Sequence, residues 1–262
     1  MKYIVFSDLD GTLRPKDGGL SPRMIEAIKK FQEAGNLFVM TTGRNRQKAE
    51  EFAKEYGGSR YIIDANGGEV FDTLKRKTIF SADIPKETME KLWKIAKKFG
   101  ARLCVNIAAD FRFVTAKRED DSNYVEKVFK SFDEICGKYK IVGGYFSGFS
   151  DNDRPALKLE ALKIKDLGYP NEGKNGGENY LDFVYASCDK GIGVKKLLQH
   201  LNVSYDKAIS MGDGMNDTPM FSATAISVAM ANGSEQVKYV ADVVADHVQR
   251  DGAAKFLESL IK

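Results

Sequence analysis

Two aspartates stand two positions apart in FSDLDGTLRP, residues 6–15, directly after an apolar run. The like charges of Asp8 and Asp10 repel, so a cation or a bound proton must compensate them wherever they cluster with further acids. Oxygen ligands without supporting histidine or cysteine favour Mg²⁺, which keeps several waters and commonly shares its coordination shell with a phosphate. Taken alone, the segment is more simply a turn with Asp10 and Gly11 at its corner.

Three further polar segments follow short apolar runs in the same way. In open α/β sheets the binding site forms at the carboxyl ends of the strands. Asp8 and Asp10 would then share one edge of the sheet with Asp213 and Asp217, and such a cluster of acids is a candidate Mg²⁺ site. The three segments are TTGR at 41–44, DANGG at 64–68 and GDGMND at 212–217.

The chain around these segments alternates strands and helices. Continuous β-rich apolar runs separated by helical patterns predict a parallel sheet with helices on both faces. Ser21 before Pro22 fits a helix N-cap, and Gly35 fits the end of that helix. The same pattern returns after residue 207, so we expect the two stretches to form one sheet. The expected strands lie at 3–6, 37–40, 61–63, 208–211, 225–229 and 243–244, and the expected helices at 21–34, 46–56, 217–223, 234–239 and 252–261.

Between these stretches the pattern changes to that of an α+β insert. Its runs at 102–107 and 111–115 are close enough for a hairpin, and adjacent alternating strands are typical of a half-exposed antiparallel sheet. Within the turn-rich stretch at 168–180, residues 168–175 nearly match a P-loop, but Asn175 replaces the metal-binding serine or threonine and no helix is expected after it, so we expect a flexible loop at 168–175. The other expected elements are helices at 86–99 and 123–135 and strands at 158–164 and 180–185.

The motifs occur together and in a fixed order. Asp-x-Asp-Gly-Thr alone is expected by chance in only about a few per thousand chains of this length. Here it precedes TTGR, the pair Lys190 and Gly191, and GDGMND. This set resembles the haloacid dehalogenase (HAD) superfamily of phosphotransferases. It is most similar to the Cof-type phosphatases with a C2B-type cap, because the insert lies between the second and third motifs and because VAMANGSEQVKYVADVV, residues 228–244, is similar to a pattern of that group.

The resemblance implies an α/β fold, a Rossmann-like parallel-sheet HAD core with an inserted α+β cap domain. The discontinuous catalytic core would comprise residues 1–82 and 185–262, and the substrate-specificity cap residues 83–184. Polar cap residues that could face a substrate are Arg112, Lys117, Arg154, Lys158 and Asn179. The implied substrates are small phosphorylated metabolites, with sugar phosphates favoured.

The resemblance also implies a role for each matching residue. Asp8 would be the nucleophile that forms an aspartyl-phosphate. Asp10 would protonate the leaving oxygen and later deprotonate water. Thr42 would hydrogen-bond the transferring phosphoryl group, and Lys190 would neutralise its charge. The implied Mg²⁺ ligands are Asp8, Asp10 through its backbone carbonyl, and Asp213, while Asp217, with Asn216, would complete the metal site through water or position Lys190. The implied phosphate- or substrate-binding residues are Leu9, Gly43, Arg44, Asn66 and Asn216.

Several alternatives stay open on the sequence alone. TTGR is also an ordinary strand-to-helix turn with a capping threonine, and Asn66 with Gly67 is also a simple turn. Lys195 and Lys196 compete with Lys190 for the lysine role. A phosphomutase that passes phosphate to another sugar hydroxyl would use the same residues, and a non-catalytic module that senses Mg²⁺ and phosphate is a third function.

Composition excludes several classes of protein. The 262 residues are 43% hydrophobic and 29% charged, and 40 basic against 37 acidic residues leave a net charge of +3, too little to indicate nucleic-acid binding. The first residues form neither a signal peptide nor a membrane span, which predicts a cytoplasmic protein without membrane partners. The three cysteines lack CxxC spacing and are expected as reduced thiols. No heptad pattern indicates an oligomer, so we expect a monomer.

Overall fold

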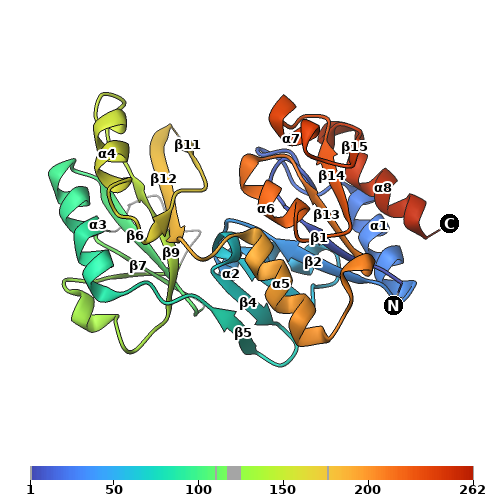
Figure 1. The fold of residues 1–262 in the computed structure, drawn as a ribbon, viewed down its shortest axis with the longest axis horizontal. Helices are drawn as coiled ribbons and strands as arrows, with labels where there is room; N and C mark the ends of the chain where they lie inside the picture. Colours follow the sequence, from blue (N-terminus) through green and yellow to red (C-terminus); the bar gives the residue numbers. More distant parts are fainter. Residues whose placement is uncertain (1, 110, 117–124, 176, 262) are drawn as a thin grey trace. The chain divides into compact units, whose positions relative to one another are not determined.

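The computed structural model describes residues 2–109, 111–116, 125–175 and 177–261 (Figure 1). The chain forms two compact units. The core unit comprises Met1–Arg44, Lys48–Phe80 and Asp189–Lys262, and the inserted unit comprises Asn45–Gln47 and Ser81–Cys188. The assignment of these parts to catalysis and to substrate specificity stays a prediction.

The core unit contains one eight-stranded sheet in the order β15-β14-β13-β1-β2-β3-β4-β5. Strand β1 lies parallel to both β2 and β13, with Ile4 opposite Leu37 on one side and Ala208 on the other. The prediction that the first and last parts of the chain form one sheet is therefore confirmed. The strands are β1 (Ile4–Ser7), β2 (Leu37–Thr41), β3 (Tyr61–Asp64), β4 (Glu69–Asp72), β5 (Lys77–Ser81), β13 (Ala208–Gly212), β14 (Ile226–Met230) and β15 (Val243–Ala245).

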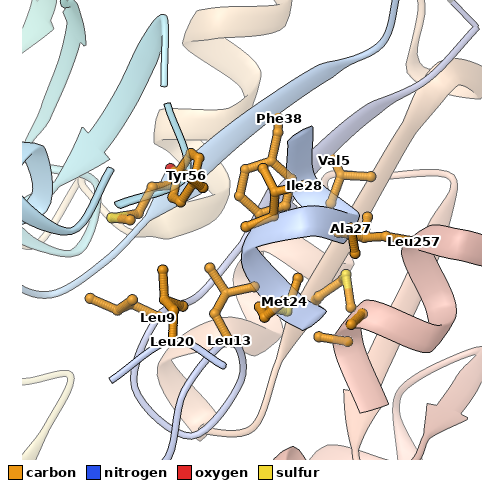
Figure 2. Packing of buried hydrophobic residues seen from close by; sticks show 14 of the residues in the cluster. Val5, Leu9, Leu13, Leu20, Met24, Ala27, Ile28, Phe38, Tyr56 and Leu257 are labelled. Atoms are coloured by element: carbon orange, nitrogen blue, oxygen red, sulfur yellow. The ribbon is translucent and has the colours of Figure 1, made fainter. Parts of the chain in front are cut away.

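Helices cover both faces of this sheet, which explains why its central strands consist mainly of apolar residues. Val5 and Phe38 point into a cluster with α1, α2 and α8, whereas Ile4 and Val39 point into a second cluster with α5, α6 and α7. Figure 2 shows Ile28 of α1 beside Phe38 and Val5. The helices are α1 (Pro22–Glu33), α2 (Arg46–Glu55), α5 (Lys190–Leu201), α6 (Thr218–Phe221), α7 (Glu235–Tyr239) and α8 (Gly252–Leu260).

Helix α1 begins as its sequence predicts. The Ser21 side chain accepts a hydrogen bond from the Met24 N–H at 3.0 Å, and Pro22 occupies the first helical position. Proline has no N–H to leave unsatisfied there, and the serine oxygen satisfies one of the free donors of the first turn. The local sequence therefore sets the residue at which α1 begins after the loop that follows β1.

The inserted unit contains a second sheet in the order β10-β12-β9-β6-β7-β8, with β11 paired to β12. All its strand pairs are antiparallel except β7 with β8. The predicted hairpin of β6 and β7 is confirmed, and the predicted strand at 180–185 lies within β12. The elements are α3 (Lys86–Lys98), β6 (Arg102–Ile107), β7 (Arg112–Val114), β8 (Glu126–Val128), β9 (Ile141–Ser147), α4 (Arg154–Ala161), β10 (Leu167–Gly168), β11 (Glu172–Asn175) and β12 (Glu178–Tyr185).

Two predicted elements of the inserted unit are wrong. In the described part of 123–135, a helix was expected, but strand β8 and a 3₁₀ turn at Phe132–Glu134 occur instead. Phe132 packs edge-on against Trp93 with ring centroids 5.6 Å apart, so aromatic burial outweighs helix propensity there. In place of the expected strand at 158–164, residues 158–161 end helix α4, in which Leu157 and Ala161 are buried one turn apart, and a turn follows.

The expected flexible loop at 168–175 is wrong as well. Residues 172–175 form β11, which pairs with β12 so that Glu172 lies opposite Leu181. Gly177 has φ +83° at the turn between these strands. Glycine adopts this backbone conformation without steric cost, and the turn-rich composition is therefore that of a hairpin.

All three cysteines have free thiols, as expected. Within the described ranges, no helix has the length and apolar character needed to cross a membrane.

Candidate active site

The first acidic motif forms a closed turn at the end of β1. Asp8 follows the strand directly, and its N–H donates to the Met211 carbonyl of β13 at 2.9 Å. The N–H of Leu13 donates back to the Leu9 carbonyl at 3.0 Å. The Leu9 side chain is fully buried in the core, so only its backbone remains available to contact a ligand.

Glycine in this turn lets the last acidic motif approach. Gly11 has φ +93°, and a Cβ at this position would lie 2.3 Å from Asp213 Oδ2. The next residue, Thr12, donates its hydroxyl to Asp213 Oδ1 at 3.4 Å. The amide of Asn232 donates to the Gly11 carbonyl at 2.7 Å, which ties the segment after β14 to the same turn. The motif therefore needs glycine for space and threonine to orient Asp213.

Asp217 is the internal support of the loop after β13. Its Oδ2 accepts the N–H groups of Asp213 at 3.0 Å and Gly214 at 2.9 Å, and its Oδ1 accepts from Lys190. The residue is fully buried. Both carboxylate oxygens therefore already bind groups of the chain itself, which makes Asp217 a support for the loop and for the lysine.

Lys190 links the first acidic motif to the last one. It is the first residue of α5, whose N-cap Asp189 accepts the Ile192 N–H at 2.7 Å. Its Nζ donates to Asp8 Oδ1 and to Asp217 Oδ1, both at 2.6 Å, and the residue is 0% exposed. Burial alone would lower the pKa of Lys190, but the charges of Asp217 and Asp8 outweigh burial and raise it. The alternative lysines, Lys195 and Lys196, are exposed on the same helix.

The carboxylates of this cluster carry more negative charge than one lysine can balance. Oxygen atoms of Asp8, Asp213 and Asp217 all lie within 4.8 Å of one another. Burial, opposed by Lys190 and aided by the other two acids, raises the pKa of Asp8 to about 8. Burial together with Asp217 raises the pKa of Asp213 to about 6. A divalent cation would relieve this repulsion, and the all-oxygen donor set fits Mg²⁺.

Asp10 lies outside this cluster and is held by two arginines. Arg44 donates from Nε to Asp10 Oδ2 at 2.6 Å and from Nη2 to Oδ1 at 3.0 Å. Arg14 donates to Oδ1 from Nη2 at 2.7 Å and from Nε at 3.0 Å. Burial alone would raise the pKa of Asp10, but the hydrogen bonds and charges of Arg44 and Arg14 hold it below its usual value. Arg44, expected to bind phosphate, thus binds the expected general acid here.

Arg14 has no place in the motifs that indicated the site. The one signal for it in the sequence is its position four residues after Asp10 in FSDLDGTLRP. Such a spacing is informative inside a helix but not inside an unknown turn.

Asn66 joins the loops that follow β2 and β13. Its Oδ1 accepts the Nδ2–H of Asn216 at 3.0 Å, and a Cβ on Gly43 would lie 2.9 Å from its Nδ2. The Thr42 hydroxyl accepts the Arg44 N–H at 3.1 Å inside the turn, whereas α2 begins only at Arg46, so Thr42 does not cap that helix. All five of these expected binding residues lie together, and their contacts with phosphate stay predictions.

The turn that carries Asn66 is backbone-strained and also places Lys190. Ala65, Asn66 and Gly67 have φ values of +47°, +54° and +91° in succession. Such conformations cost about 1–3 kcal/mol each for residues other than glycine and persist where the surroundings enforce them. A Cβ on Gly67 would lie 2.0 Å from the Asp189 carbonyl, so glycine lets the start of α5 approach this turn.

The expected cap residues bind partners within the inserted unit. Arg112 donates from Nε to Glu126 at 2.7 Å, and Lys158 pairs with Glu172 at 2.6 Å. Asn179 is buried, accepts from Arg154 and donates to the Phe149 carbonyl at 2.8 Å. Lys117 lies outside the described residues. Contacts of this set with a substrate stay predictions.

Comparisons with known proteins agree with the motifs. Residues 5–257 match the haloacid dehalogenase-like hydrolase family. A putative bifunctional phosphatase/peptidyl-prolyl cis-trans isomerase of Streptococcus pyogenes serotype M6 is 28% identical over 260 residues, covering 98% of this chain but only 53% of that protein. The 5-amino-6-(5-phospho-D-ribitylamino)uracil phosphatase of Bacillus subtilis is 24% identical over 257 residues, covering 96% of this chain and 93% of that protein.

The fold is similar to that of a solved structure from the same superfamily. The solved structure of a HAD subclass IIB sugar phosphatase superposes with a TM-score of 0.81 at 22% identity, covering 99% of this chain and 100% of that one. The predicted fold class, a Rossmann-like core with an inserted α+β unit, is therefore confirmed, and so is the resemblance to the Cof-type phosphatases of the HAD superfamily. The C2B type of the cap stays a prediction.

Proposed function

The chain belongs to the haloacid dehalogenase-like hydrolases and is a phosphatase, and we propose that it is a Mg²⁺-dependent enzyme that hydrolyses small phosphorylated metabolites through an aspartyl-phosphate on Asp8. One observation carries the proposal. The buried ammonium of Lys190 bridges Asp8 and Asp217 at 2.6 Å each, and Asp213 belongs to the same acidic cluster. A nucleophilic carboxylate paired with an ammonium group, beside acids whose charge is not compensated, is suited to a phosphate ester that binds together with a divalent cation.

The reaction would proceed in two displacements. A carboxylate oxygen of Asp8 attacks phosphorus, the ester P–O bond breaks, and its electron pair stays on the leaving oxygen, which takes a proton from Asp10. Water then attacks the aspartyl-phosphate and gives its proton to Asp10, which releases inorganic phosphate and restores Asp8. Lys190 would lower the charge repulsion between the Asp8 carboxylate and the phosphoryl group.

Asp8 and Asp213 would hold Mg²⁺ together with the backbone carbonyl of Asp10, and Asp217, whose two oxygens already accept hydrogen bonds from the chain, would complete the shell through water. When bound, the ion would supply positive charge to the acids and to the phosphoryl oxygens. The size of the required rate acceleration explains why several charge-neutralising groups are needed. Hydrolysis of phosphate monoesters can require accelerations near 10²¹, on the order of 20 kcal/mol or more, whereas a general acid supplies only about 10²–10⁴. Electrostatic stabilisation must supply much of the difference.

Sugar phosphates are the proposed first substrates. The Bacillus subtilis relative is named for a phosphorylated ribityl compound, and the superposed structure is described as a sugar phosphatase. Both names describe a phosphate ester of a polyhydroxylated group. The inserted unit would select the leaving group, because it is the part of the chain that the catalytic motifs do not use.

The test is release of inorganic phosphate from a panel of sugar, nucleotide and cofactor monoesters, with Mg²⁺ or with a chelator. The intact protein is compared with Asp8→Asn, and circular dichroism verifies that both are folded. Release that needs Mg²⁺ and disappears in the variant supports the proposal and ranks the substrates. An isomerised sugar phosphate in place of free phosphate would identify a mutase. Folded protein that binds Mg²⁺ but turns over no ester would identify a sensing module.

A further inference from the structure

We infer that Arg14 is a positioning residue that aims the Asp10 carboxylate for proton transfer, and that Phe52 supports it. This inference rests on the proposed role of Asp10 as general acid and base. It assigns to Asp10 Oδ2 the transferred proton and to Oδ1 the anchoring contact.

Arg14 is held on several sides at once. Its Nη1 donates to the Gly18 carbonyl and its Nη2 to the Lys16 carbonyl at 3.3 Å, while its guanidinium carbon lies 4.5 Å from the centre of the Phe52 ring. The residue is 9% exposed. A guanidinium that is fixed by two carbonyls and an aromatic face has little freedom to turn. Its remaining N–H groups therefore point in a set direction, toward Asp10 Oδ1.

The backbone makes this contact part of the nucleophile's own turn. The Gly11 N–H donates to the Arg14 carbonyl at 2.7 Å, and the Arg14 N–H donates to the Leu9 carbonyl at 3.2 Å. Asp10 and Arg14 thus lie at opposite ends of one closed turn that begins directly after Asp8. Holding Asp10 against Arg14 therefore also holds it at a set place relative to Asp8.

The two oxygens of Asp10 have different partners. Oδ1 accepts from both Arg14 and Arg44, whereas Oδ2 accepts from Arg44. Phe52 also lies beside Arg44, with its ring centre 5.3 Å from that guanidinium carbon, but the Arg44 side chain is 30% exposed against 11% for Arg14, and it enters from the loop after β2. A phosphate would therefore draw away Arg44 in preference to Arg14. Oδ2 then becomes available for the proton while Arg14 still holds Oδ1.

Leaving-group dependence tests this inference with a readout that a purely structural role would not change. A sugar alkoxide must be protonated as it leaves, whereas para-nitrophenolate is stable without a proton. We expect Arg14→Met to lower kcat/KM for a sugar phosphate by about 10- to 100-fold, the range that a misplaced group of about 1 Å can cause. For para-nitrophenyl phosphate, kcat/KM should fall by less than about threefold, since general-acid catalysis contributes little there.

Arg23→Met is the matched control. Arg23 also forms a two-point pair with a carboxylate, Glu258, but at the surface with 45% of its side chain exposed. This variant should change neither kcat/KM value. If Arg14→Met folds poorly, Arg14→Lys replaces it, because lysine keeps the charge but cannot bind Asp10 and the carbonyls in the same fork. The same split between the two substrates is expected.

Asp10→Asn separates failure of this inference from failure of the proposed function. If Asp10→Asn loses more kcat/KM for the sugar phosphate than for para-nitrophenyl phosphate but the Arg14 variants do not, the positioning role of Arg14 is overturned. Equal losses on both substrates in the Arg14 variants overturn it as well. No split for Asp10→Asn itself overturns the role of Asp10 as general acid, and with it the proposed mechanism.

Discussion

Replacing Lys190 by methionine measures how strongly the buried ammonium stabilises the acidic cluster. The side chain is 0% exposed and donates two hydrogen bonds of 2.6 Å to carboxylates. A hydrogen bond to a charged group contributes about 1.5–3 kcal/mol, so two contribute about 3–6 kcal/mol. Removing one partner of a buried ion pair costs about 3–5 kcal/mol, because it leaves the other charge uncompensated. We expect Lys190→Met to lower the free energy of unfolding by about 3–5 kcal/mol.

Urea unfolding followed by far-ultraviolet circular dichroism, in buffer with a chelator, measures this loss. Fluorescence alone would not, because the one tryptophan, Trp93, lies in the inserted unit. Lys195→Met is the control, since it makes the same change at an exposed position of α5 and should cost less than about 0.5 kcal/mol. Adding Asp217→Asn to Lys190→Met should cost less than the sum of the single changes. A loss below about 1 kcal/mol for Lys190→Met would refute the argument.

Three further predictions concern metal, backbone and pH. Saturating Mg²⁺ should stabilise the intact protein, by about 2.7 kcal/mol at one hundred times its dissociation constant, and Asp213→Asn should abolish that shift in thermal unfolding. Gly67→Ala should unfold at lower urea than Gly57→Ala. The φ values are alike, +91° at Gly67 and +92° at Gly57, but of these two only Gly67 lies where a Cβ would meet backbone, 2.0 Å from the Asp189 carbonyl. Equal midpoints would contradict this. Burial alone would raise the pKa of Glu126, but Arg112 and Arg102 hold it below its usual value. Ionised Glu126 therefore stabilises the fold fully above its unfolded pKa of about 4.3, and this stabilisation is lost as pH falls through the lower pKa of the folded state. Glu126→Gln should therefore make the acid-induced change in Trp93 fluorescence less steep with pH. An unchanged pH dependence would contradict this.

Most of the core unit was predicted because its signals are local, whereas β4, β5 and α5 were not among the expected elements. The apolar run at 3–6 indicates a strand buried on both faces, and Ser21 with Pro22 marks a helix start within two residues. The inserted unit was predicted less well because its sheet has one face on a core and one face away from it. There, the burial of Phe132 against Trp93 decides the conformation, and this contact joins residues 39 positions apart.

The meeting of the acidic motifs was also predictable. Parallel strands carry their carboxyl ends to one edge, so Asp8 after β1 and Asp213 after β13 had to approach each other once the two halves shared a sheet. The pairing of Asp10 with Arg14 and the link between Asn66 and Asn216 were not predictable. A hydrogen bond depends on distances within a few tenths of an ångström and on direction, and motif spacing sets neither across a turn or across 150 residues.

The sequence by itself determined the kind of chemistry: carboxylates and a threonine at the ends of predicted strands and a lysine before a helix, in the order of one hydrolase family. Only the tertiary structure decided the partners, with Lys190 between Asp8 and Asp217 and Asp10 between two arginines. The physical reason is that residue type and the position at which a strand ends are local properties of the sequence. The choice among several charged partners depends on burial and geometry, which arise only when segments far apart in the chain pack together.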